Sequence, residues 1–534
     1  MSKWWIVFFS LPLYLIGLEY TTLFFQADEW LYMKIASEMY ARNEWWITYW
    51  LGVPTYYKPP MAYWGMMMLF PFGENQMFWG RVSVAITTLA TLFFCYKLSQ
   101  DLLGKKEACI STALLSCSYG FLAFGRVGVM DMMLMFWLTV SLFCFIRARD
   151  RQSLLYTGLF YCSLGLSTLV KGPIAPLISV ITAFAALSLY GGWRVFFRPA
   201  CFPGLLLGLL LSVSWPIALY FKGEFDAWFS FFIIGENFGK FADRLGYPAL
   251  PFISTIFKWA LPWDLFLLAL PVFLICKHFW QDSGMVILLL WGITIIGVHL
   301  IPAVRLPWYT FLALPAVLMM AGAYISRYSN HWLTRCTLRI TALLFLLLAL
   351  VVSALLRFSF THFLPYLSIA SAAIGLFACA GLLYKGRIAP TCVSLAVAIL
   401  SLNFLSSHLV DPQFPFAARE ILQTSTRPLA VVRIETGRLS QEHAQFSFYL
   451  DRPITETRGV EKTTAFFLQG GDLILTDTDY RAWQQQVPMQ PEKHRILLSW
   501  WQWRDAIPLS QIEAALRAGD VRMLQEPIHI IRGE

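Results

Sequence analysis

The sequence predicts an all-α polytopic membrane protein that ends in a small soluble α/β domain, and three observations carry this prediction. Of the 534 residues, 58% are hydrophobic and only 14% are charged, which is far more apolar than a water-soluble domain. Apolar stretches of about 18 to 23 residues, the length that crosses a bilayer, recur up to residue 407. The composition then becomes polar from Asp411-Pro412 onward.

The apolar stretches predict about thirteen transmembrane helices in a domain of residues 1–407. Their expected ranges are 4–25, 77–97, 108–126, 128–147, 154–171, 173–191, 200–221, 252–276, 284–302, 308–326, 338–356, 364–384 and 389–407. The first stretch lacks a small-residue cleavage site such as Ala-x-Ala, so we interpret it as a retained helix. Lys3 in front of it predicts a cytoplasmic N-terminus.

The basic residues agree with this orientation. The connections expected in the cytoplasm contain Lys97, Lys105, Lys106, Arg147, Arg149, Arg151, Arg194, Arg198, Lys277, Arg327, Arg335, Arg339, Lys385 and Arg387. An odd number of spans places the residues after 407 on the outer side. We therefore attribute the formal net charge of +9 mostly to membrane topology and not to a nucleic-acid binding surface.

Two outer loops, residues 26–76 and 222–251, are much longer than a connection between helices requires. The first is rich in tryptophan and tyrosine, which favour the membrane interface. Within it, residues 30–40 and 60–72 are predicted to form interfacial helices.

Residues 408–534 are predicted to form the soluble α/β domain. Expected strands are 430–434 and 472–476, and expected helices are 441–449, 480–486 and 509–518. All ten cysteines precede residue 393, so this domain is predicted to have no disulfide framework and no cysteine-based metal site.

The sequence contains no phosphate-binding loop, no Gly-x-Gly-x-x-Gly motif and no paired histidines at metal-ligand spacing. It does contain a set of polar residues that the topology places at the outer ends of helices. They are Asp28, Glu29, Tyr57, Lys58, Arg126, Asp131, Lys171, Glu236, Asn237, Lys240, Arg305 and Tyr309. Cations on the outer side run against the usual charge distribution, which is expected if they bind phosphate.

Individual members of this set also have structural explanations. Asp28 and Glu29 could cap a helix, and Lys58 before two prolines could begin an extended segment. Lys171 and Arg305 could be cations that extend to the interface. Asp131 could be a turn residue, although a carboxylate inside an apolar run is costly.

A cluster of carboxylates and cations at the outer membrane face suits sugar transfer from a lipid phosphate. That reaction needs a base for the acceptor, cations for the leaving phosphate and a groove for the isoprenoid chain. Two other classes are a transporter or flippase, which would place polar groups at the membrane midplane, and a non-catalytic scaffold. The scaffold leaves Asp131 and the long first loop without a role.

Several motifs occur in an order that resembles a known group of proteins. They are Ala27-Asp28-Glu29, Tyr57-Lys58-Pro59-Pro60, Arg126 to Asp131, Lys171-Gly172-Pro173, Glu236-Asn237-Phe238 and Leu306-Pro307-Trp308-Tyr309. The chain resembles the lipid-to-acceptor glycosyltransferases of the C-type membrane fold. Within that group it is most similar to bacterial aminoarabinose transferases of lipid A and to relatives of dolichyl-phosphate-mannose protein mannosyltransferases.

The resemblance implies a bacterial inner-membrane enzyme with a periplasmic C-terminal domain. It implies a polyprenyl (undecaprenyl) phosphate donor of a hexose or pentose, and a lipid A or other glycolipid acceptor, with a protein acceptor as the alternative. Asp28 would be the acid/base residue, supported by Glu29 and Asp131. The lipid phosphate would be bound by Lys58, by Tyr309, and by Lys240 or Arg305, with Tyr57, Arg126, Lys171, Glu236 and Asn237 in the same substrate site. Residues 45–64 would order over the bound donor and exclude water.

The sequence departs from the aminoarabinose transferases at two positions. Their glutamate before Lys-Pro-Pro is Tyr57 here, and their histidine after the later glutamate is Asn237. Since those two residues can be metal ligands in the family, the chain is predicted to lack an equivalent zinc site and to need no evident cofactor. Use of another divalent metal and the identity of the sugar stay open.

Overall fold

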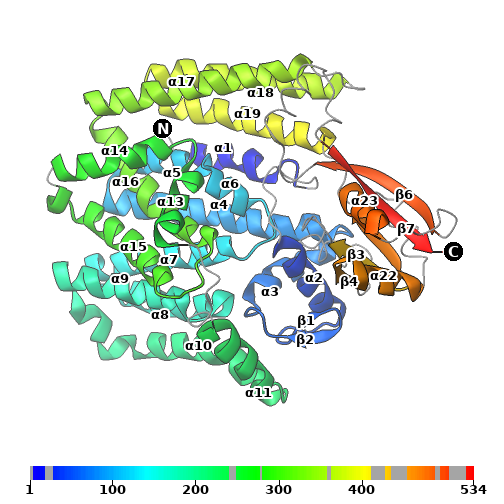
Figure 1. Ribbon diagram of the computed structural model, residues 1–534. Helices are drawn as coiled ribbons and strands as arrows, with labels where there is room; N and C mark the ends of the chain where they lie inside the picture. Colours follow the sequence, from blue (N-terminus) through cyan, green and yellow to red (C-terminus); the bar gives the residue numbers. More distant parts are fainter. Residues whose placement is uncertain are drawn as a thin grey trace.

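The computed structural model describes residues 4–18, 28–239, 248–276, 279–357, 363–409, 427–433, 454–486, 494–503 and 525–533. Most of them form a bundle of helices that run side by side (Figure 1). The C-terminal strands lie at the same end of this bundle as the short elements of the first outer loop (Figure 1).

In the described residues, nine helices are long and apolar enough to cross a membrane, or up to eleven if each of two bent pairs counts as one span. The nine contain α4 (Gln76–Leu102), α7 (Asp131–Arg151), α8 (Leu154–Lys171), α10 (Phe202–Phe221), α15 (Ser283–Leu300), α16 (Leu314–Arg327), α17 (Trp332–Ala354), α18 (Phe363–Tyr384) and α19 (Ile388–Leu409). The predicted span 173–191 corresponds to the shorter helix α9 (Ile174–Tyr190), and α1 (Trp4–Leu15) covers the first part of the predicted span 4–25. Thirteen crossings therefore stay a prediction.

Two predicted spans are not straight helices, so the sequence interpretation was wrong on this point. Helices α5 (Lys105–Ser116) and α6 (Tyr119–Gly125) meet at 61°. Helix α13 (Ala249–Ala260) meets the first residues of α14 (Asp264–Cys276) at 117°. The second bend follows from Pro262, which cannot donate a backbone hydrogen bond and disfavours a helical conformation at Leu261.

The two bends contact each other, which explains how interrupted helices are tolerated in an apolar region. The Tyr119 N–H donates to the carbonyl of Leu261 at 2.8 Å. The Trp263 indole donates to the carbonyl of Leu114 at 2.9 Å. Backbone groups that the breaks leave without helical partners are thus hydrogen-bonded inside the protein.

The first outer loop contains α2 (Asp28–Ala41), the hairpin β1 (Thr48–Trp50) and β2 (Val53–Thr55), α3 (Met61–Met67) and η1 (Phe70–Phe72). The helix predicted at 30–40 corresponds to α2, and the one predicted at 60–72 is divided into α3 and η1. Their location at the membrane interface stays a prediction. Leu51 and Gly52 form the hairpin turn with φ of 51° and 82°, the left-handed region that such two-residue turns require. The Glu38 carboxylate accepts hydrogen bonds from both turn N–H groups, at 2.9 and 2.8 Å, which ties the hairpin to α2.

The second long outer loop begins with α11 (Phe225–Trp228) and the π-helix η4 (Phe229–Phe238). The remaining short turns are η2 (Trp193–Phe197), η3 (Pro199–Cys201), η5 (Phe279–Gln281), η6 (Pro307–Ala313) and η7 (Leu355–Arg357).

The C-terminal part contains a five-stranded mixed sheet with the strand order β4-β3-β5-β7-β6. Its elements are β3 (Leu429–Arg433), β4 (Thr455–Arg458), α22 (Val460–Leu468), β5 (Asp472–Thr476), α23 (Asp477–Gln486), β6 (His494–Trp503) and β7 (Gln525–Gly533). Strand β3 runs parallel to β4 and β5, whereas β7 runs antiparallel to β5 and β6.

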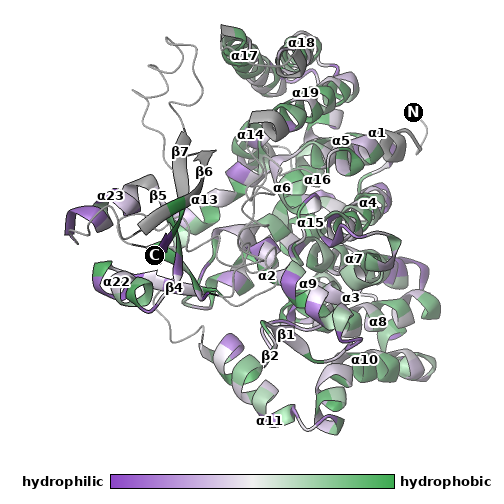
Figure 2. Cartoon of the chain, turned by 90° about the vertical axis from the view of Figure 1, so that its right-hand side faces the viewer, coloured by the Kyte–Doolittle hydropathy of each residue, from purple (hydrophilic) through white to green (hydrophobic). Residues whose placement is uncertain are grey.

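The predicted strands at 430–434 and 472–476 and the helix at 480–486 correspond to β3, β5 and α23. The predicted helices at 441–449 and 509–518 lie outside the described residues. Hydrophilic residues are frequent on α23, in contrast to the mainly hydrophobic bundle (Figure 2). The domain boundary at residue 408 and the periplasmic location stay predictions.

Candidate functional site

A cluster of ionisable side chains forms where several elements begin or end. Asp28 and Asp131 are the first residues of α2 and α7, and Lys171 is the last residue of α8. The Lys171 ammonium donates to the Asp131 carboxylate at 2.7 Å, and the Lys58 ammonium donates to Glu236 at 2.8 Å. These five residues come from segments far apart in the sequence. We call their side chains the outer polar cluster, after the side of the membrane on which the sequence predicts them.

Asp28 is half-buried within electrostatic range of Asp131, Lys171 and Lys58. Burial raises the pKa of Asp28, the Asp131 carboxylate raises it further, and the two lysines offset part of this increase. Among the described side chains, the Tyr32 hydroxyl is its hydrogen-bond donor, at 3.5 Å. A carboxyl group with a raised pKa takes up a proton more readily and is suited to act as a general base.

Lys58 is held tightly although it follows an exposed hairpin. Its side chain is 9% exposed, and the ammonium lies 4.0 Å from the centre of the Tyr57 ring. Burial raises the pKa of Tyr57, and the nearby Glu236, Asp28 and Tyr309 raise it further. The Tyr57 hydroxyl therefore stays protonated and can donate a hydrogen bond to an anion.

Tyr309 lies on the other side of Lys171, in η6. The Lys171 ammonium is 5.3 Å from the centre of the Tyr309 ring. The centre of the His299 ring is 5.0 Å from the centre of the same Tyr309 ring. His299 is buried, and its Nδ1 donates to the carbonyl of Ile295 at 2.8 Å. Sequence reasoning missed His299. Its signal was a single histidine near the end of an otherwise apolar span.

Glu29 points to different partners from its neighbour Asp28. Its carboxylate accepts two hydrogen bonds from the Arg81 guanidinium, at 2.7 and 2.8 Å, and one from the Gly128 N–H at 2.6 Å. Since Glu29 is 1% exposed, its oxygens are committed to joining α2 to α4 and to the loop before α7. Arg81, a cation inside an apolar span, is a second residue that sequence reasoning missed.

Arg126 donates its hydrogen bonds to groups outside the outer polar cluster. It is 1% exposed, and its guanidinium donates to the carbonyls of Leu13 and Ile16, the latter at 2.7 Å. These carbonyls are at the C-terminal end of α1, where the helix leaves them without internal partners. The observed contacts of Arg126 therefore stabilise a helix end.

The remaining predicted residues differ in their placement. The Asn237 side chain donates to the carbonyl of Phe232 at 2.6 Å, within η4. Arg305 is half-buried and donates to the carbonyl of Leu300 at 3.2 Å. Lys240 lies outside the described residues.

No group of three or more histidine, cysteine, aspartate or glutamate side chains in the described part of the chain is placed to hold a metal ion. The predicted lack of a zinc site, which rests on Tyr57 and Asn237, stays a prediction.

An apolar groove of about 460 Å³ runs between α8 and α10, and chain neighbours of two lysines of the outer polar cluster line it. Pro59 and Gly172, which directly follow Lys58 and Lys171, line it together with Trp215, Trp228 and Phe232. Glycines let the two helices approach closely at its floor: a Cβ atom on Gly165 would lie 2.1 Å from the carbonyl oxygen of Gly208.

Known proteins share parts of this sequence. Residues 57–217 match the family described as dolichyl-phosphate-mannose-protein mannosyltransferase. An undecaprenyl phosphate-α-4-amino-4-deoxy-L-arabinose arabinosyl transferase of Pseudomonas fluorescens is 27% identical over 60% of this chain and 58% of that relative. A transferase of the same description from Edwardsiella ictaluri is 27% identical over 61% of this chain and 60% of its own length. The chain thus matches less than two thirds of the length of these relatives.

The fold has a solved counterpart. The crystal structure of ArnT from Cupriavidus metallidurans bound to undecaprenyl phosphate superposes with a TM-score of 0.68. The match has 16% identity and covers 99% of this chain and 98% of that chain. The apo state of the same protein gives a TM-score of 0.67 at 17% identity, over 98% and 97% of the two chains. The resemblance expected from the motifs is therefore confirmed, as is a mostly helical fold like that of ArnT. The count of thirteen spans and the separate C-terminal domain stay predictions.

Proposed function

We propose that this chain is an integral membrane glycosyltransferase that moves a sugar from a polyprenyl phosphate to a glycolipid acceptor. The observation that carries the proposal is the apolar groove lined by Pro59 and Gly172, the residues that directly follow Lys58 and Lys171, with Asp28 within electrostatic range of both lysines. A groove of this kind suits an isoprenoid tail, and the lysines suit the phosphate to which the tail is attached. The names of the relatives and the undecaprenyl phosphate bound to ArnT point to the same donor class.

In the proposed complex, the donor tail lies in the groove and the phosphate is bound by Lys58, Lys171 and the Tyr57 hydroxyl. The ion pairs Lys58–Glu236 and Lys171–Asp131 hold both ammonium groups in place before the donor arrives. Cations that are already positioned stabilise the charge that develops on the leaving phosphate without reorganisation during the reaction.

The chemical step follows from this arrangement. The oxygen of the acceptor forms a bond to the anomeric carbon of the sugar, and the bond from that carbon to the phosphate oxygen breaks. Asp28 takes the proton of the acceptor hydroxyl, and the lipid phosphate leaves with its negative charge next to the two lysines. We take Asp28 as the base because Asp131 is engaged by Lys171 and Glu29 is paired with Arg81.

A turnover assay tests the proposal. Purified protein in lipid nanodiscs is incubated with polyprenyl phosphates of different sugars and a glycolipid acceptor, and released polyprenyl phosphate is measured. We expect Asp28→Asn to lower turnover about 100-fold or more while the protein stays folded. Asp226→Asn, at an exposed aspartate of α11, is the matched control and should turn over normally. Equal turnover by wild type and Asp28→Asn would reject Asp28 as the base.

The finer assignments follow from the relatives. We propose 4-amino-4-deoxy-L-arabinose, a pentose, as the first donor sugar to test and lipid A as the first acceptor, because the curated relatives are named for that sugar. The alternative is a protein acceptor, which the match of residues 57–217 to the mannosyltransferase family favours. A panel of lipid A and unfolded peptide acceptors separates the two. We further propose a bacterial inner-membrane location with the outer polar cluster and the C-terminal sheet on the periplasmic side.

A further inference from the structure

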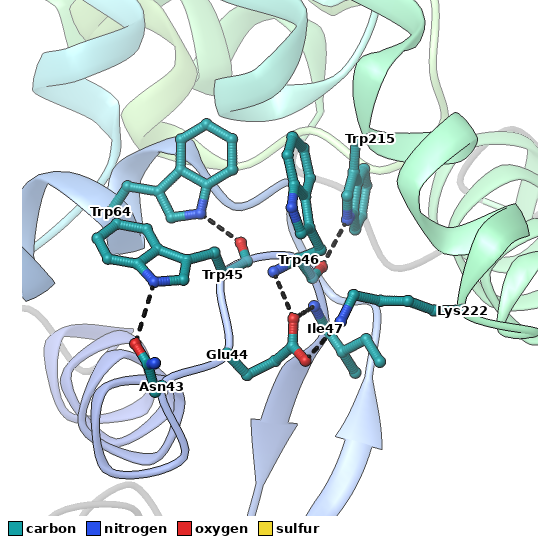
Figure 3. Close-up of polar contacts among 8 residues, drawn as sticks. All are labelled: Asn43, Glu44, Trp45, Trp46, Ile47, Trp64, Trp215 and Lys222. Atoms are coloured by element: carbon teal, nitrogen blue, oxygen red, sulfur yellow. Dashed lines mark hydrogen bonds and ion pairs between the residues drawn. The ribbon is translucent and has the colours of Figure 1, made fainter.

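The first outer loop is fastened to the end of α10 by a set of polar contacts (Figure 3). The Glu44 carboxylate accepts hydrogen bonds from the Trp46 and Ile47 N–H groups, at 3.0 and 3.4 Å, and from the Lys222 ammonium at 2.8 Å. The Trp215 indole of α10 donates to the carbonyl of Trp46 at 2.9 Å. Residues 44–47 are therefore hydrogen-bonded both to Trp215 in α10 and to Lys222, which directly follows α10.

Trp215 also lines the groove. Its side chain is 2% exposed, and its ring lies 5.2 Å from Phe232 and 5.7 Å from Trp228, two other lining residues. The Trp215 ring thus lines the groove. Its N–H points to the carbonyl of Trp46 in the first outer loop (Figure 3).

The held segment leads directly to the outer polar cluster. From Trp46 the chain passes through the hairpin to Tyr56, whose hydroxyl donates to Glu224, and then to Lys58. Since the hairpin is also tied to α2 by Glu38, a shift of residues 44–47 would be transmitted to Lys58 through a short, braced connection.

We propose that Trp215 is a positioning residue that couples occupation of the groove by the donor tail to the position of Lys58. The inference rests on the proposed function and adds a determinant of donor specificity to it. A long tail packs against the Trp215 ring and fixes the indole in the orientation that holds the Trp46 carbonyl. A short tail leaves the ring without these contacts, so the loop and Lys58 are less well positioned.

The consequence is a dependence of kcat, and not of KM alone, on tail length. Binding energy from a remote part of a substrate raises kcat when it is used to position groups at the reacting centre. A groove that only anchors the tail would change KM and leave kcat unaffected.

Trp228 provides a matched control. It lines the same groove and is buried, but no described residue accepts a hydrogen bond from its indole nitrogen. Trp215→Phe and Trp228→Phe therefore make the same chemical change in the same wall, and Trp215→Phe alone removes a bond to the outer loop.

The experiment compares donors with a C55 tail and a C10 tail that carry the same sugar. We expect kcat of the wild type to be about tenfold higher with the C55 donor, the size of effect that one well-placed hydrogen bond supports. Trp215→Phe should reduce kcat with the C55 donor to the C10 level, whereas Trp228→Phe should keep the contrast in kcat even if its KM changes. An unchanged contrast in Trp215→Phe, or an equal loss in Trp228→Phe, overturns the inference.

A second measurement needs no sugar. Hydrogen exchange of residues 44–58 is followed with C55 or C10 polyprenyl phosphate, and binding of each lipid is measured separately by native mass spectrometry. We expect the C55 lipid to protect this segment in the wild type and in Trp228→Phe but not in Trp215→Phe. Binding without protection in the wild type contradicts the coupling, whereas failure to bind either lipid contradicts the proposed function.

Discussion

Replacing Glu29 should damage the fold, although its neighbour Asp28 can be replaced without that effect. The side chains of Glu29 and Arg81 are 2% and 4% exposed, and three hydrogen bonds end on the Glu29 carboxylate. Glu29→Ala removes a carboxylate that is paired with the buried Arg81 guanidinium and accepts from the Gly128 N–H. Removing one partner of a buried ion pair costs about 3 to 5 kcal/mol of folding stability. Asp28→Asn removes no ion pair among the described residues and should cost far less.

The assay is thermal unfolding of the purified protein in detergent, followed by near-UV circular dichroism, with Asp28→Asn and the double variant Glu29→Met/Arg81→Met alongside. We expect Glu29→Ala to unfold at a clearly lower temperature than Asp28→Asn. The double variant should recover much of the loss because it removes both charges together. Equal unfolding temperatures for Glu29→Ala and Asp28→Asn would refute the structural role of Glu29, and a double variant less stable than Glu29→Ala would refute the pairing.

Two further predictions concern the site. Because burial raises the pKa of Asp28 and a general base must be deprotonated, turnover should fall as the pH drops through that pKa. Lys58 lowers the pKa of Asp28, so Lys58→Met should move the acid limb of the pH profile of kcat/KM to higher pH. A shift to lower pH would contradict the placement of Lys58 near Asp28. Gly165→Ala places a Cβ atom 2.1 Å from the Gly208 carbonyl oxygen and should separate α8 from α10. We expect a raised KM for the donor with a smaller change in kcat, and an unaltered KM would argue against the groove as the tail site.

Hydropathy and topology were sufficient to predict most of the outer polar cluster. Asp28, Asp131 and Lys171 are at ends of helices, and helix ends on one side of a membrane lie at similar depth. That depth could be inferred from the sequence without knowing which helices are neighbours. Lys58 and Glu236 lie on the two long loops that the topology places on the same side of the membrane, so they could be predicted to belong to the cluster too.

The direction in which a side chain points could not be predicted in this way. Asp28 and Glu29 are adjacent, so depth cannot separate them, yet the rotation of α2 turns Glu29 toward Arg81 and Asp28 toward the lysines. The bend at Leu261 was missed because a hydropathy window averages over the interruption and gives the same result for a bent pair as for one span. His299 was missed because its importance depends on the ring of Tyr309, which comes from the next element of the chain.

The charges of the outer polar cluster indicate how a phosphate could enter it. Asp28, Asp131 and Glu236 provide three carboxylates against the two ammonium groups of Lys58 and Lys171, so net charge does not attract an anion to these five residues. A phosphate must instead replace a carboxylate as the partner of a lysine. Glu236 is 20% exposed and can turn toward water, whereas Asp131 is 7% exposed and would lose its counter-charge in a buried position. Exchange at Lys58 is therefore the less costly route. This exchange requires that its backbone and Tyr57 hold Lys58 in place while Glu236 leaves. The contacts between the first outer loop and α10 can hold the backbone in this way.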